Sequence, residues 1–152
     1  MKPFVSTVTN KLDAKGRVSV PAPFREILSA QGNAGLYVFP SLRVQALEGA
    51  GNELIGRWAE RLAGLDPFSE EQDALAEVVL GAAQFVAWDA EGRVKLPEDL
   101  LGQAGIADTI TFVGMGDRFR LWNPEAFAAQ HRTAVERARL ALVRPRSSEG
   151  AA

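Results

Sequence analysis

Three basic side chains, Lys11, Lys15 and Arg17, gather around one short predicted turn near the start of the chain. An arginine at the end of a tight turn can direct its planar guanidinium at two acceptors, as guanine edges and phosphate oxygens require. The two lysines would neutralise phosphate charge and add affinity that depends on salt rather than on base sequence. These residue types in this arrangement predict a nucleic-acid-binding surface at the turn.

The turn itself is predicted from Asp13 and Gly16. An aspartate can accept hydrogen bonds from the backbone just after it, and a glycine tolerates positive φ. Residues 5–12 are rich in β-branched types and residues 17–20 alternate, so a strand is predicted on each side and a β-hairpin is expected. Asp13 and Arg17 could also simply pair across the turn and hold it, and we expect both roles.

The same ten-residue phrase occurs again 76 positions later. Residues 12–21 read LDAKGRVSVP and residues 88–97 read WDAEGRVKLP, with six of the ten positions identical. At the roughly 7% frequency of a common residue, chance alone would give fewer than one identity. The chain therefore contains an internal duplication, and its second turn is built by Asp89 and Gly92 and ends at Arg93.

The two copies differ in charge. Glu91 stands where the first copy has Lys15, and three further acidic residues lie close to Arg93 in sequence. We therefore expect Arg17 to contact nucleic acid, whereas Arg93 is expected to serve mainly the structure of its turn. Both arginines remain candidate contact residues, but equal contact by the two copies is not expected.

The surrounding sequence predicts the same order of elements twice. Pro21 and Pro97 suit the first turn of a helix, where a missing N–H costs nothing. Two helices are predicted between the copies and one more from residue 123 to about 142. Further strands are predicted over residues 36–39, 42–47, 84–88, 93–96, 109–113 and 118–122. The domain division expected from this order is 4–50 for the first repeat, 51–81 for a helical insert, 82–127 for the second repeat, and 128–152 for a C-terminal helix and flexible tail.

The net charge of −2 argues mildly against a nucleic-acid partner, but its distribution does not. Residues 1–47 hold six Lys/Arg against two acids, residues 48–127 six against fifteen, and residues 128–152 five against two. A basic segment beside an acidic one can direct an anionic ligand to one face, although acidic helices could equally serve only solubility.

Nothing in the sequence predicts an enzyme, a cofactor or a metal site. The chain has no cysteine and one histidine, His131, on a polar helical stretch. Gly114 and Gly116 flank a predicted hairpin turn and lack the helix that a phosphate-binding loop needs. No run approaches the roughly 20 apolar residues of a membrane span, and no signal peptide is recognised, so a cytoplasmic protein is expected.

The remaining arginines and tryptophans have plainer interpretations. Arg25 and Arg43 are expected on the solvated surface, with a secondary DNA contact as the alternative for Arg25. Trp58, Trp88 and Trp122 lie in apolar patterns and are expected in the core or at a subunit interface.

A turn bearing Asp-x-x-x-Arg, followed by an apolar-x-Pro step into a helix, resembles the swapped-hairpin DNA-binding fold of AbrB-like regulators. Two copies in about 150 residues, joined by a helical insert, resemble the MraZ family. The resemblance covers roughly residues 4–140 and is strongest over 12–26, 89–97 and 112–122, whereas residues 41–52 are looser than the pattern usual there.

The resemblance implies an α+β fold in which two pseudo-symmetric AbrB-like β-hairpin/helix repeats form one β-barrel-like core with peripheral helices. It implies a sequence-specific transcriptional regulator that binds double-stranded DNA at repeated sites upstream of the division and cell-wall gene cluster. It further implies a homo-oligomeric ring of eight or more subunits, located in the cytoplasm and on the nucleoid, with no small-molecule substrate. DNA contact by the first motif arginine maps onto Arg17, and Arg93 is the matching position. The alternative is an oligomeric scaffold protein whose duplicated hairpins pack subunits instead of touching DNA.

Overall fold

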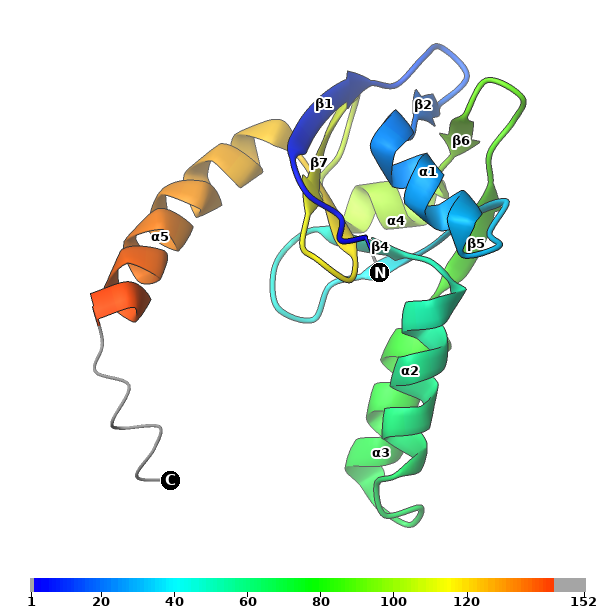
Figure 1. Ribbon diagram of the computed structural model, residues 1–152, viewed down its shortest axis with the longest axis vertical. Coiled ribbons are helices and arrows are strands. Elements are labelled where there is room, and N and C mark those ends of the chain that lie inside the picture. Colours follow the sequence, from blue (N-terminus) through cyan, green and yellow to red (C-terminus); the bar gives the residue numbers. More distant parts are fainter. Residues whose placement is uncertain (1, 144–152) are drawn as a thin grey trace.

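The computed structural model describes residues 2–143, so the flexible tail expected over 144–152 lies outside the described residues (Figure 1). The chain combines antiparallel strands with helices, which confirms the expected α+β class. The larger sheet has six strands, in the order β1 (Thr7–Lys11), β7 (Thr109–Gly114), β8 (Phe119–Trp122), β4 (Leu47–Ala50), β3 (Gly35–Pro40) and β5 (Gln84–Ala87). A second sheet pairs only β2 (Arg17–Ser19) with β6 (Arg93–Lys95), and we call this pair the ribbon.

Helices surround the sheets and extend beyond them. They are α1 (Ala22–Ala30), α2 (Asn52–Ala63), α3 (Glu70–Leu75) with its π-helical continuation η1 (Ala76–Leu80), α4 (Glu98–Gln103) and α5 (Pro124–Val143). Pro21 and Pro97 occupy the N-cap positions of α1 and α4, one residue before the helical turn that we expected them to start. Figure 1 shows α2 with α3, and separately α5, projecting from the body as two arms. No helix among the described residues is both long enough and apolar enough to span a membrane.

The hairpin expected from residues 5–12 and 17–20 is wrong as a strand pairing, although its turn forms. The Gly16 N–H donates to the Asp13 carbonyl at 3.0 Å, and the Asp13 N–H donates to the Arg17 carbonyl at 2.7 Å. Beyond the turn the strands separate, because β1 pairs with β7 and β2 pairs with β6. The apolar face of β2 explains the choice: Val18 lies opposite Val94, and both are buried. Pairing with the second copy buries both valines together.

The second copy behaves in the same way, since β5 pairs with β3 and not with β6. The order of strands in the six-stranded sheet is consequently symmetric about its centre. Each strand has a counterpart in the other half of the chain, and the two counterparts lie at equal distances from the middle of the sheet. β1 corresponds to β5, β7 to β3, and β8 to β4. An approximate two-fold axis therefore passes between β4 and β8, and again between Val18 and Val94 of the ribbon. This arrangement brings the two turns side by side at one end of the molecule (Figure 1).

The strand expected over residues 42–47 is also wrong. Residues 42–46 form a loop, and β4 begins only at Leu47. Ser41 explains the difference, because its hydroxyl accepts hydrogen bonds from the backbone N–H groups of Arg43 (3.2 Å) and Val44 (3.3 Å). Its own N–H donates to the Ala46 carbonyl at 3.0 Å. Such local bonds give the backbone an alternative to a strand ladder.

One hydrophobic core joins residues of both halves. Four phenylalanines form its aromatic centre, with ring centroids 4.8–6.3 Å apart: Phe4, Phe24, Phe112 and Phe119. Of the tryptophans, Trp122 is buried, Trp88 packs against the core, and Trp58 is half-buried against Phe39. The core lies beneath the ribbon and fixes its inner face, so its outer face is held rigidly toward solvent.

Candidate nucleic-acid interface

The first turn is held by the carboxylate of Asp13. Its Oδ1 accepts the backbone N–H groups of Lys15 (2.9 Å) and Arg17 (2.8 Å), and its Oδ2 accepts the Nε–H of Arg17 at 2.8 Å. Gly16 has φ +79°, in the left-handed region that favours glycine. One side chain thus sets both the backbone of the turn and the direction of the Arg17 guanidinium.

The second turn repeats this geometry. Asp89 Oδ1 accepts the N–H groups of Glu91 (2.9 Å) and Arg93 (3.0 Å), and Asp89 Oδ2 accepts the Arg93 Nε–H at 3.0 Å. Gly92 also has φ +79°. The shared residues of the duplicated phrase therefore build the same local structure twice.

These hydrogen bonds stabilise the ionised carboxylates. The backbone N–H of Arg17 is the main cause that lowers the pKa of Asp13 below its usual value, with the Arg17 guanidinium adding to it. The backbone N–H of Arg93 lowers the pKa of Asp89 in the same way. A carboxylate with a lowered pKa in the folded state stabilises the fold above its unfolded pKa, near 4, and loses that effect as the pH falls through the folded value.

Acidification should therefore weaken both turns. Between pH 6 and pH 3 we expect the melting temperature of the wild-type protein to fall more steeply than that of an Asp13→Asn/Asp89→Asn variant. The asparagines keep an oxygen acceptor for the backbone but have no charge to lose. Thermal melts followed by circular dichroism across this range check the prediction. Parallel curves for the two proteins would contradict it.

The outer face of the ribbon carries three of the basic groups near the turns: Arg17, Arg93 and Lys95. Arg17 lies opposite Lys95, and Ser19 lies opposite Arg93, on the face away from the core. Lys95 is exposed, and so are Lys15 in the first turn and Lys11 at the end of β1. A two-stranded antiparallel ribbon is one of the elements that the DNA major groove admits.

Sequence reasoning missed Lys95. The alternation of residues 93–96 already places Lys95 on the face opposite the apolar residues, which was a usable signal. Its position beside Arg17, however, depends on the pairing of β2 with β6, which the sequence pattern does not specify.

The two turn arginines differ in the charge around them. Within the described residues, Arg17 forms an ion pair with Asp13 alone, at 2.8 Å. Arg93 lies near three carboxylates: Asp89 at 3.0 Å, Glu91 at 3.1 Å and, across the ribbon, Asp13 at 3.8 Å. The guanidinium of Arg17 is consequently the less neutralised of the two and the better placed to bind an external anion.

Arg25 was expected on the solvated surface, but it is half-buried over the second turn. Its Nε–H donates to the Val20 carbonyl at 3.0 Å, and its guanidinium would lie only 2.5 Å from a Cβ on Gly92. A Cβ on Gly16 would meet nothing within 4 Å. The matching position of α4 is Leu101, and a cavity of about 520 Å³ remains there beside the first turn. Arg25 thus places a positive charge beside the second turn, which itself carries the negative charge of Glu91.

His131 lies on α5 with its ring 5.1 Å from that of Phe127. Among residues 2–143 no group of three or more histidine, cysteine or acidic side chains is arranged to hold a metal ion.

Several known proteins are similar to this chain. Residues 79–141 match the family model described as "MraZ protein, putative antitoxin-like". A protein of Xanthobacter autotrophicus named transcriptional regulator MraZ is 45% identical over 139 residues, which is 91% of this chain and 88% of that protein. The protein of the same name from Parvibaculum lavamentivorans is 49% identical over 133 residues, 85% of this chain and 81% of its own. That from Rhizobium meliloti is 41% identical over 136 residues, covering 90% and 93%.

Proposed function

Because the chain belongs to the MraZ family, we propose that it is a transcriptional regulator that binds double-stranded DNA with the outer face of its ribbon and its first turn. The family is one of regulators and not of enzymes. One observation carries the proposed contact: Arg17, whose single ion pair within residues 2–143 is with Asp13, stands beside exposed Lys95 on a two-stranded ribbon. Arg17 would bind a guanine edge or a phosphate, and Lys11, Lys15 and Lys95 would neutralise the backbone.

We further propose the domain arrangement and the assembly that the sequence predicts. The two repeats, 4–50 and 82–127, would form one pseudo-symmetric barrel-like core, with the insert 51–81 and the C-terminal segment 128–152 as appendages. Subunits would assemble into a ring of eight or more and bind repeated sites upstream of the division and cell-wall gene cluster, on the nucleoid. The small size of each ribbon supports such an assembly, because affinity for DNA would then come from several subunits bound to one DNA.

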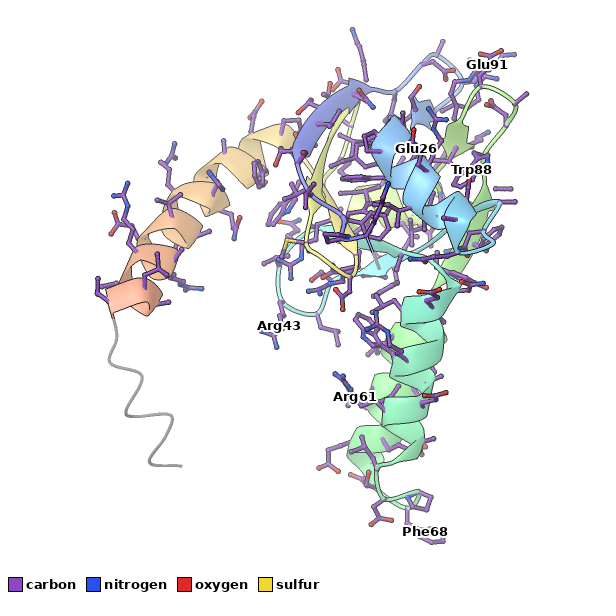
Figure 2. The ribbon with its side chains drawn as sticks, viewed as in Figure 1. Glu26, Arg43, Arg61, Phe68, Trp88 and Glu91 are labelled. Atoms are coloured by element: carbon purple, nitrogen blue, oxygen red, sulfur yellow. The ribbon has the colours of Figure 1, made fainter. Side chains whose placement is uncertain are left out.

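A second candidate function, an oligomeric scaffold, is favoured by the two helical arms. Helix α5 has no buried residue, and Leu142 near its end is 87% exposed. Phe68, between α2 and α3, is also exposed, at the tip of the other arm (Figure 2). Most of the stability of a helix in a protein comes from packing one of its faces against other elements. Such arms fit subunit packing, which a DNA-binding ring also needs.

A DNA titration separates these two functions. Labelled DNA carrying the repeats upstream of the protein's own gene is titrated by fluorescence anisotropy at several salt concentrations, and a shuffled sequence serves as the control. We expect tighter binding to the upstream DNA and a linear fall of log affinity with log salt. A particle whose mass in solution corresponds to a ring, but which binds neither DNA, would support the scaffold and contradict DNA binding.

A further inference from the structure

A second group of arginines surrounds a cavity far from the two turns. The cavity has a volume of about 520 Å³ and lies between the loop 41–46, helix α2 and strands β4 and β8. Its basic lining residues are Arg43, Arg61, Arg118 and Arg120. Figure 2 shows Arg43 and Arg61 low in the view, whereas Glu91 marks the turns at the top.

The floor of the cavity is a buried ion network. Glu48, only 5% exposed, accepts a hydrogen bond from Arg118 Nε at 3.0 Å and another from Arg120 Nε at 3.1 Å. Arg118 also binds Asp117 through Nη1 at 3.0 Å. These contacts fix both guanidinium groups in place before any ligand arrives, which lowers the entropy cost of binding.

The floor arginines keep donors that nothing in the described chain uses. The side chain of Arg120 is only 10% exposed, and its hydrogen bonds to Glu48 use Nε alone. Among residues 2–143 no side-chain nitrogen is both fully buried and unpartnered, so the Nη atoms of Arg120 keep some access to solvent, and Arg120 is one of the residues that line the cavity. A buried guanidinium with free donors facing a cavity is a strong site for an oxyanion.

The rim adds charge that the protein does not neutralise. Arg43 in the loop and Arg61 on α2 are exposed, and neither forms an ion pair within the described part of the chain. Four arginines thus face two lining acids, Glu48 and Asp117, in a protein of net charge −2. A concave site with surplus positive charge concentrates anions.

An aromatic wall completes the cavity. Trp58 of α2 is half-buried and packs edge-on against Phe39, with ring centroids 5.5 Å apart at 73°, and both line the cavity. Guanidinium groups and an indole ring that line one cavity suit a ligand that joins a phosphate to a flat ring. The volume also lies within the usual range for small-molecule sites.

We propose that this cavity binds a nucleotide, with its phosphoryl group on Arg118 and Arg120 and its base against Trp58. Arg43 and Arg61 close over the phosphate from the rim. The site is separate from the ribbon, so the proposal does not rest on DNA binding by the turns.

The test uses the full-length protein without DNA and ADP as the probe, followed by isothermal titration calorimetry. Wild-type protein should bind ADP saturably at one site per chain. Arg43→Gln and Arg61→Gln should each weaken binding about tenfold, since each removes a charged contact to phosphate. Arg132→Gln on exposed α5 is the matched control, because it makes the same charge change outside the cavity and should leave ADP binding unchanged.

Three further measurements identify the ligand class. Inorganic phosphate should bind at least tenfold more weakly than ADP, because it lacks the ring. Trp58→Leu should weaken ADP and leave phosphate unchanged, with thermal melts establishing that the variant is folded. A short DNA duplex should not displace ADP. The proposal is overturned if ADP does not bind saturably at millimolar concentration, or if Arg61→Gln and Arg132→Gln bind ADP with equal affinity. It is also overturned if phosphate binds as tightly as ADP. Displacement of ADP by DNA would likewise overturn it and would assign the site to the phosphates of the DNA backbone.

Discussion

Replacing Arg17 by glutamine should weaken binding to the upstream DNA by about tenfold or more, since a bidentate contact to a base contributes roughly 1–3 kcal/mol. The side chain is only half-buried, and among the described residues only Asp13 forms an ion pair with it, so its remaining donors are available to DNA. Arg17→Lys keeps the charge but lacks the planar fork, and we expect it to lose specificity for the upstream sequence over shuffled DNA. Fluorescence anisotropy at several salt concentrations measures both effects.

Arg93→Gln provides the matched control, because it removes the equivalent pair with an aspartate four residues earlier. Its guanidinium is shared among three carboxylates, so its loss should weaken DNA binding less than the loss of Arg17. Melting temperatures of the two variants separate damage to the turns from loss of contact. If Arg93→Gln weakened binding as much as Arg17→Gln, the ranking of the two copies would be wrong.

Replacing Glu48 by alanine should lower the free energy of unfolding by about 3–5 kcal/mol. Glu48 neutralises both Arg118 and Arg120, and the second of these is almost fully buried. Without the carboxylate, Arg120 remains as a largely buried charge that has lost its ion-pair partner among the described residues. Urea denaturation followed by circular dichroism gives the free energy directly.

Glu60→Ala on the exposed side of α2 removes the same charge from a carboxylate that forms no ion pair within residues 2–143, and a change within about 0.5 kcal/mol is expected. A double change of Glu48 and Arg120 to methionine should be milder than Glu48→Ala, because it removes one of the buried charges together with its partner. Similar unfolding free energies for Glu48→Ala and Glu60→Ala would contradict the role assigned to the network.

Local features of the fold could be predicted from the sequence because neighbouring residues determine them. Asp13 and Gly16 specify a turn through bonds within five residues, and Pro21 precedes a helix. The positions of α5 and of the β7–β8 hairpin followed from the same kind of signal. Each depends on the chain over a single turn, which is the range that residue type and spacing describe.

Partner choice could not be predicted in this way. An alternating strand such as β2 needs a buried neighbour for Val18, and both β1 and β6 satisfy that pattern in sequence. Only the three-dimensional packing of both halves determines that β2 pairs with β6 and not with β1. For the same reason the sequence did not reveal Lys95 as a candidate residue or the position of Arg25 over the second turn, since each reaches the turn region through a contact between the two copies.

The exchange of strands between the halves has a consequence for how the protein is made. β1 leaves the ribosome early, but its partner β7 follows about a hundred residues later, as the 102-residue separation of Thr9 and Thr111 illustrates. Pairings of this range are slow to form, because a long loop must close first. The first repeat therefore waits, with β2 unpaired until β6 has been made and with β1 unpaired until translation has passed Gly114. A message truncated between the repeats yields not half a working protein but a chain with open strands, prone to pair with its neighbours.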